Sequence, residues 1–219
     1  MTFSDTSRGA PPLLWAMAAV FCLLEGAFQL ADAGILPFPD LRAYAYYHGA
    51  FLDMWFQDVL NGLSVPVWFW SSWITHAFLH GGALHLLMNT AVFLGLGGYI
   101  ARGIGNGRFL VLFVVTAIAG ALVFGLLAET RGPMVGASGA LFGFIGALKR
   151  WEWRYIQATG APQNRFWGTI VGLTILNLML LLYFPGEGSL AWEAHLGGFI
   201  AGFLIAPVLA PRAAGPSPI

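Results

Sequence analysis

The sequence predicts an all-α integral membrane protein, a bundle of six transmembrane helices joined by mostly short loops. Its composition and its hydropathy support this fold class. Of the 219 residues, 58% are hydrophobic and only 9% are charged, and the mean hydropathy is +0.74. An average soluble domain carries about 25% charged residues, so this chain has too few charges to cover a soluble surface. The composition therefore excludes a soluble enzyme, a nucleic-acid-binding protein and a disordered protein.

Six apolar segments have about the 20 residues that a helix needs to cross the hydrocarbon core of a bilayer. The predicted spans are residues 12–31, 73–101, 107–128, 136–156, 166–184 and 190–210. The N-terminus lacks a basic stretch followed by a small-residue cleavage site, so the first segment is interpreted as a span rather than a signal peptide. We expect one domain, residues 1–219, with its core at about 12–210 and a disordered tail after 210.

The basic residues predict the orientation, because lysine and arginine gather on the cytoplasmic side of a membrane. With the N-terminus inside, only Arg42 and Arg131 fall on the outer side. The inner side then holds Arg8, Arg102, Arg108, Lys149, Arg150, Arg154, Arg165 and Arg212. We therefore expect both termini in the cytoplasm of a cell whose plasma membrane (in a bacterium, the inner membrane) holds the protein.

The first outer loop, about residues 32–72, is long and rich in aromatic residues. Tyrosine and tryptophan side chains settle at the level of the lipid headgroups. We therefore expect short helices that are partly embedded in the membrane interface, rather than an extracellular cap. The aromatic residues concerned are Tyr44, Tyr46, Tyr47, Trp55, Phe56, Trp68, Phe69 and Trp70.

Polar residues occur at three places inside the predicted spans, where ionisable groups are rare and usually functional. The second span contains His85 and Asn89, the fourth begins near Ser138, and the sixth contains His195. At about 1.5 Å per helical residue, these residues lie roughly 17–26 Å above the basic residues at the inner helix ends. The hydrocarbon core is about 30 Å thick, so all four are expected at a similar level in its outer half.

Ser138 lies too close to Lys149 for a complete span between them. The segment 133–137 is therefore expected to enter the membrane as irregular backbone, which is tolerated only where protein or water surrounds it. Ser138 would then stand at or near the N-terminus of a helix, where free backbone N–H groups favour a developing anion. This arrangement predicts an oxyanion site.

Small residues predict how the fourth and sixth spans pack on each other. One face of the fourth span carries Gly139, Gly143 and Gly146, and one face of the sixth carries His195, Gly198 and Gly202. Small faces let helix backbones approach closely, and packing these two faces would bring Ser138 to His195. A hydroxyl beside an imidazole predicts a nucleophile and its general base.

Three further features complete the predicted site. His85 and Asn89 are four residues apart, so they share a helix face, and both can donate hydrogen bonds. Glu193 lies on another side of its helix from His195, so we expect a Ser–His dyad without a carboxylate. Phe142, one turn into the fourth span, is the candidate ring that packs against the imidazole.

Three motifs closely resemble those of the rhomboid family of intramembrane serine proteases. They are His80-x4-His85-x3-Asn89, Gly136-x-Ser138-Gly139 and Ala194-His195-x2-Gly198-x3-Gly202, on the second, fourth and sixth spans as in that family. The resemblance covers about residues 12–210 and implies a six-helix rhomboid bundle. It also implies a serine endopeptidase without metal or cofactor, whose partners are the lipid bilayer and single-span membrane protein substrates, not nucleic acid.

The resemblance also implies residue roles. Ser138 is the nucleophile and His195 the general base, and the oxyanion hole consists of the Ser138 backbone N–H with the side chains of His85 and Asn89. Phe142 falls where the family places an aromatic ring against the catalytic histidine. Supporting positions are His80, which looks structural, and the glycines Gly136, Gly139, Gly198 and Gly202.

Two further features concern the first outer loop and the first span. Many family members carry a Trp-Arg pair in the first outer loop where this chain has Ser71-Ser72, so the anchoring of that loop stays open. Glu25 in the first span is interpreted as a paired or snorkelling acid.

Two other functions remain as alternatives. One is a metal-dependent membrane hydrolase or metal-binding protein that uses His76, His80, His85 and His195, since the first two have a helical ligand spacing. That reading gives Ser138 no role. The other is a non-catalytic rhomboid-like protein that binds membrane clients, although such proteins typically lack the nucleophile or the base, and both are present here.

Overall fold

The structure is a computed structural model that describes residues 9–128, 132–183 and 191–210. Most of these residues are helical, which confirms the predicted all-α class. The predicted disordered tail after residue 210 lies outside the described residues.

Five of the six predicted spans coincide with helices, with ends that differ by a few residues. They are α1 (Pro12–Asp32), α7 (Asn106–Leu127), α8 (Ser138–Thr159), α9 (Asn164–Tyr183) and α10 (Trp192–Ile205). The structure places Ser138 at the first position of α8, as the sequence predicted.

The second span begins later than predicted. Residues 69–78 form α4 (Phe69–Thr75) and a 3₁₀ turn (His76–Phe78), and the helix starts only at Ala83. It then runs through α5 (Ala83–Val92), a π-helical segment (Phe93–Gly97) and α6 (Gly98–Ile104). Gly82 has φ +134°, a backbone conformation that ends any continuous helix from residue 73. The predicted start at 73 was therefore wrong, and residues 73–82 belong to the loop before this helix, which keeps the name outer loop from its predicted side.

Within the described residues, three helices are long and apolar enough to cross a membrane: Pro12–Asp32, Ala83–Ile104 and Asn106–Leu127. α10 is apolar but has only 14 residues, and α8 carries several charged residues beyond Lys149. The finding supports a membrane protein, and the count of six spans stays a prediction.

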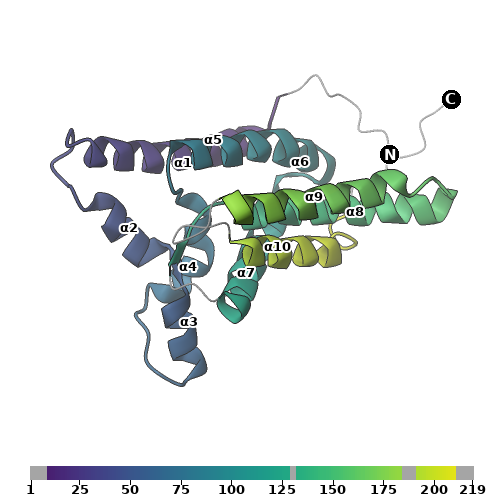
Figure 1. Cartoon of the computed structure of the whole chain (residues 1–219). Coiled ribbons are helices and arrows are strands. Elements are labelled where there is room, and N and C mark those ends of the chain that lie inside the picture. The colour runs from purple at the N-terminus through teal and green to yellow at the C-terminus, as the bar shows by residue number, and fades with distance from the viewer. Residues whose placement is uncertain (1–8, 129–131, 184–190, 211–219) are drawn as a thin grey trace.

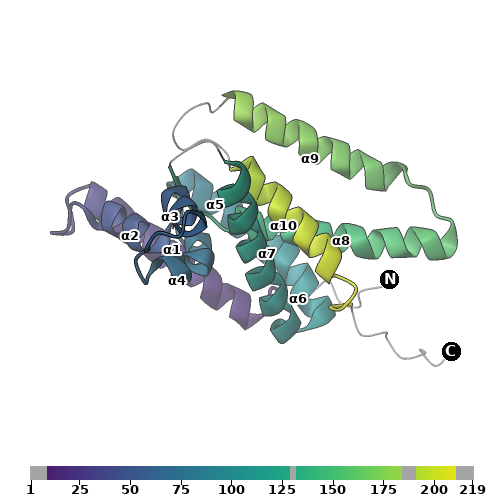
Figure 2. The same ribbon diagram turned by 90° about the horizontal axis from the view of Figure 1, so that it is seen from below.

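The helices form two groups. α1 packs against α5 and the π-helical segment, and α10 packs against both α7 and α8 (Figure 1). Between the groups lies the main core, in which the rings of Phe21, Phe93, Phe109 and Phe144 are fully buried. α9 stands apart: Figure 2 shows it returning from the end of α8 at a distance from α10.

Glycine makes the contact between α8 and α10 unusually close, which confirms the predicted packing of these two faces. A Cβ added to Gly198 would fall on the backbone carbonyl of Gly139, and one added to Gly202 would fall on that of Gly143. Gly146 meets the backbone of Phe199 in the same way. Backbone therefore lies directly against backbone along this interface.

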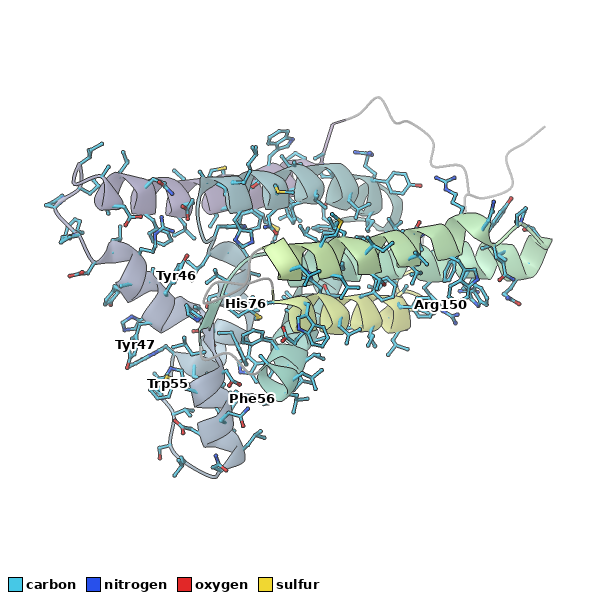
Figure 3. The ribbon with its side chains drawn as sticks, viewed as in Figure 1. Tyr46, Tyr47, Trp55, Phe56, His76 and Arg150 are labelled. Atoms are coloured by element: carbon cyan, nitrogen blue, oxygen red, sulfur yellow. The ribbon has the colours of Figure 1, made fainter. Side chains whose placement is uncertain are left out.

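The first outer loop contains the short helices α2 (Leu41–Gly49) and α3 (Asp53–Leu60), followed by α4. Between α2 and α3 the strand β1 (Phe51–Leu52) pairs antiparallel with β2 (Pro133–Met134), just before α8. Aromatic rings hold the loop together, for example Tyr47 and Trp55, whose centroids are 6.2 Å apart (Figure 3). The helices agree with the sequence prediction, and their depth in the membrane stays a prediction.

Arg42 anchors this loop to α1. Its guanidinium binds Glu25 at 3.0 Å and Asp32 at 2.8 Å, and it donates to the carbonyl oxygen of His80 at 3.2 Å. Glu25 is only 1% exposed, so it is a paired acid rather than a snorkelling one. The hydrogen bond to Glu25 raises the pKa of Arg42 above its usual value, which keeps the guanidinium charged. Arg42 therefore ties the loop to α1, whereas the hydroxyls of Ser71 and Ser72 donate to backbone carbonyls three residues earlier in the loop.

Candidate active site

Ser138 and His195 meet where α8 and α10 cross. The Oγ atom of Ser138 lies 2.9 Å from Nε2 of His195, within hydrogen-bond distance. The two residues are 57 positions apart in the sequence and belong to different helices. The imidazole is 5% exposed, so this contact lies in a largely enclosed place.

The helix contact sets this distance. Ser138 directly precedes Gly139, and His195 lies one turn before Gly198. Since the Gly139 carbonyl rests where a Gly198 side chain would be, the two helices meet at the level of the pair. A larger residue at Gly198 would push the hydroxyl and the imidazole apart.

The segment before Ser138 is held by the outer loop. Met134 pairs with Phe51 in the strand ladder, and the Gly136 N–H donates to the carbonyl oxygen of His76 at 2.9 Å. Gly136 has φ +117°, a conformation that glycine adopts without strain. A Cβ at Gly136 would come within 2.7 Å of the His85 ring. These contacts fix where the backbone enters α8.

His85 and Asn89 lie on α5, one turn apart, beside that segment. The Gly81 N–H donates to Nδ1 of His85 at 3.2 Å, so the proton of the neutral imidazole is on Nε2. That nitrogen faces Gly136, two residues before Ser138. The Nδ2 atom of Asn89 donates to the His85 carbonyl oxygen at 2.9 Å, and the side chain is 5% exposed. One N–H donor of α5, the Nε2–H of His85, therefore faces the segment before α8, whereas the amide nitrogen of Asn89 donates to a carbonyl of its own helix.

Phe142 stacks on the imidazole of His195. The ring centroids are 4.1 Å apart and the planes differ by 7°. The sequence predicted this contact from the position of Phe142 one turn into α8. The stacking fixes the plane of the imidazole, but the Phe142 ring forms no hydrogen bond with the imidazole nitrogens.

Asn177 of α9 supplies a hydrogen bond to the imidazole that the sequence analysis missed. Its Oδ1 lies 2.7 Å from Nδ1 of His195. The sequence does carry a signal, since Asn177 is a polar residue within an apolar run of leucine and isoleucine. Its hydrogen-bond partner, His195, is on another helix, so the sequence alone does not connect the two residues.

A cavity of about 530 Å³ separates α9 from α8 and α10 beside these residues. Its polar lining residues are Thr174, Asn177 and His195. The remaining lining is apolar and comprises Phe142, Ile170, Leu173, Leu178, Trp192, Leu196 and Phe199. Of the pair, His195 therefore borders this mostly apolar space.

The other histidines have structural contacts. His80 is fully buried, with its ring centroid 5.3 Å from those of Phe21 and His85. His76 places Nδ1 2.8 Å from the carbonyl oxygen of Ser72. The two residues precede α5, so the assumed helical ligand spacing was wrong. In the part of the chain that the structure describes, no three His, Cys, Asp or Glu side chains converge as metal ligands.

Comparison with known proteins identifies one family. The Rhomboid domain matches residues 67–212. The chain is 31% identical to the rhomboid protease GluP of Bacillus subtilis over 67% of this chain and 27% of that protein. It is 33% identical to RHOMBOID-like protein 5 of Arabidopsis thaliana over 64% and 44%, respectively. It is 32% identical to the rhomboid protease GlpG of Photorhabdus laumondii over 61% and 45%. The matched part is thus less than half the length of each of these three relatives.

The close contact between Gly136 and His85 gives a testable prediction. Gly136→Ala should slow the reaction of Ser138 with a serine-reactive fluorophosphonate, measured by mass spectrometry, by about one to two orders of magnitude. A non-glycine residue at this φ is strained by about 1–3 kcal/mol, and about 1.4 kcal/mol corresponds to a factor of ten.

Gly81→Ala is the matched control. Its Cβ would lie 3.5 Å from Nδ1 of the same imidazole, an ordinary contact, and Gly81 has no positive φ. We expect near-normal labelling for this variant. Equal rates for both variants would contradict the role of Gly136.

Proposed function

This chain belongs to the rhomboid family, and on that premise we propose that it is an intramembrane serine endopeptidase that cleaves transmembrane segments of other membrane proteins. The observation that carries the proposal is the 2.9 Å distance between Ser138 Oγ and His195 Nε2. The names of the two bacterial relatives, both rhomboid proteases, support the same activity. The alternative of a non-catalytic client-binding protein gives no role to this contact.

The chemistry follows from the two atoms. Ser138 Oγ attacks the carbonyl carbon of the scissile peptide bond while its proton passes to Nε2 of His195. The imidazolium then donates this proton to the leaving amine, and the C–N bond breaks to leave an acyl-enzyme. Water attacks the acyl carbon as His195 takes a proton from it, and that proton returns to Ser138 Oγ.

The oxyanion of the tetrahedral intermediate needs hydrogen-bond donors. We assign this role to the backbone N–H of Ser138, the Nε2–H of His85 and the side-chain amide of Asn89. The Ser138 N–H is free because it belongs to the first turn of α8. Such donors act most strongly in a site that excludes water.

Ser138→Ala and His195→Ala should each abolish cleavage of a membrane substrate without loss of folding or membrane insertion. The double variant should be no worse than either single one, because the two groups act as a unit. Asn89→Ala should retain partial activity, since removing one oxyanion donor costs about 10²–10³ in rate.

Activity of purified variants in lipid vesicles is the measurement, with and without a chelator. Full activity of Ser138→Ala would overturn the proposal. Loss of wild-type activity with chelator would favour the metal-dependent alternative.

We propose that cleavage occurs near the outer face of the membrane, with both termini of this chain in the cytoplasm. The excess of basic residues on the inner side supports this orientation. The substrate must unwind locally, because a carbonyl within an intact helix is hydrogen-bonded and shielded. Glycine and proline are poor helix formers and ease this step, and the small residues around Ser138 favour a small residue just before the cut.

A single-span substrate with a tag on its outer side tests, in cells, both the side of the membrane on which cleavage occurs and the need for local unwinding. The tagged fragment should appear outside the cell, and replacing glycine or proline downstream of the cut by leucine should reduce its release sharply. Release into the cytoplasm would invert the orientation. Equal cleavage of a uniformly leucine-rich helix would show that unwinding does not select substrates.

A further inference from the structure

Asn177 of α9 forms a second hydrogen bond that fixes how its amide is oriented. Its Nδ2 donates to the carbonyl oxygen of Leu173, one turn earlier in α9, at 2.9 Å. A carbonyl oxygen only accepts, so the amide nitrogen must face Leu173 and the amide oxygen must face His195. Because Oδ1 also only accepts, Nδ1 of His195 carries the proton in their 2.7 Å hydrogen bond.

This bond determines what the opposite nitrogen can do. A neutral imidazole has one N–H, so a proton on Nδ1 leaves Nε2 as an acceptor. Nε2 is the atom that lies 2.9 Å from Ser138 Oγ. The serine hydroxyl can then donate to it, which is the direction of proton transfer that nucleophilic attack needs. In the other tautomer Nε2 would donate to Ser138 and could not accept its proton.

We propose that Asn177 is a positioning residue that holds His195 in the tautomer and orientation in which it accepts the proton of Ser138. The inference rests on the proposed function and extends the pair to a chain of three residues from three helices. A carboxylate at this place would also stabilise the imidazolium by charge. A neutral amide orients the ring without adding a charge to the apolar cavity.

The surroundings of Nδ1 offer few substitutes. The cavity wall around Asn177 is apolar except for Thr174 and His195, and Thr174 Oγ1 donates to the Ile170 carbonyl within its own helix at 3.0 Å. Phe142 holds the plane of the imidazole but accepts no hydrogen bond in that plane. Without Asn177, Nδ1–H would lack an acceptor among the described residues that line the cavity, which disfavours this tautomer.

Other contacts keep α9 in place. Near the start of this helix, Lys149 Nζ donates to Thr169 Oγ1 at 2.9 Å, and the rings of Trp153 and Phe166 are 5.1 Å apart. A substitution at Asn177 therefore removes the bond to His195 while leaving these attachments of the helix.

The test compares three variants of the full chain. Asn177→Leu has a similar size but no acceptor, and Asn177→Asp keeps an oxygen that can accept from Nδ1–H. Thr174→Val is the matched control, because it removes a hydroxyl from the same cavity wall without touching His195. The readouts are kcat and KM with a membrane substrate, and ¹⁵N NMR of the histidine side chains, with the His195 signals assigned by their loss in His195→Gln.

We expect wild type, Thr174→Val and Asn177→Asp to show the Nδ1–H tautomer of His195, and Asn177→Leu to lose it. In Asn177→Leu, kcat should fall about 10–100-fold, the range seen when the group that orients a ligating imidazole is removed. KM should stay within about twofold, because the bond does not bind substrate.

An unchanged tautomer in Asn177→Leu would overturn the inference, and so would unchanged kcat. An equal loss in Thr174→Val would also overturn it, because the effect would then come from the cavity wall. Ser138→Ala separates this outcome from failure of the proposed function. If Ser138→Ala is inactive and Asn177→Leu is normal, only the role of Asn177 is wrong, whereas an active Ser138→Ala rejects the protease mechanism itself.

Discussion

The rest of the site depends on the close contact between the backbones of α8 and α10. Helices in lipid gain no hydrophobic energy by meeting, so they associate through packing and hydrogen bonds. Here Gly198 and Gly202 lie directly against the carbonyls of Gly139 and Gly143, with no room for a side chain. Ser138 and His195 stand at the end of this contact, so the same interface that joins the helices also sets their separation.

The outer loop completes the site from the other side. Its strand pairs with the residues before α8, and Arg42 links the loop to Glu25 of α1 and to the carbonyl of His80. A buried carboxylate is costly unless it is paired, which makes the Arg42–Glu25 contact a strong constraint on the loop. The position of Ser138 is therefore determined jointly by helix packing and by a loop that the sequence places far away.

The sequence predicted the elements whose signals are local. Glycine spacing predicted the contact of α8 and α10, and the short distance from Ser138 to Lys149 predicted a helix that begins at the serine. The sequence-based prediction failed where the structure of a segment, or the role of a residue, depends on contacts with residues elsewhere in the fold. The apolar aromatic residues before Gly82 suit an outer loop as well as a span, and only the fold distinguishes them. The role of Asn177 depends on its hydrogen bond to His195, which is 18 residues away on another helix.

The most direct test of whether the α8–α10 contact sets the separation of Ser138 and His195 is a substitution in this interface away from the two residues. Gly202→Ala places a methyl group on the Gly143 carbonyl, whereas Gly172→Ala on α9 meets no atom within 4 Å. The measurement is the rate at which a fluorophosphonate labels Ser138 in each variant. Overpacking typically costs about 1–3 kcal/mol, so Gly202→Ala should lower this rate about tenfold or more while Gly172→Ala leaves it unchanged. Equal labelling of both variants would show that the α8–α10 contact does not set the geometry of Ser138 and His195.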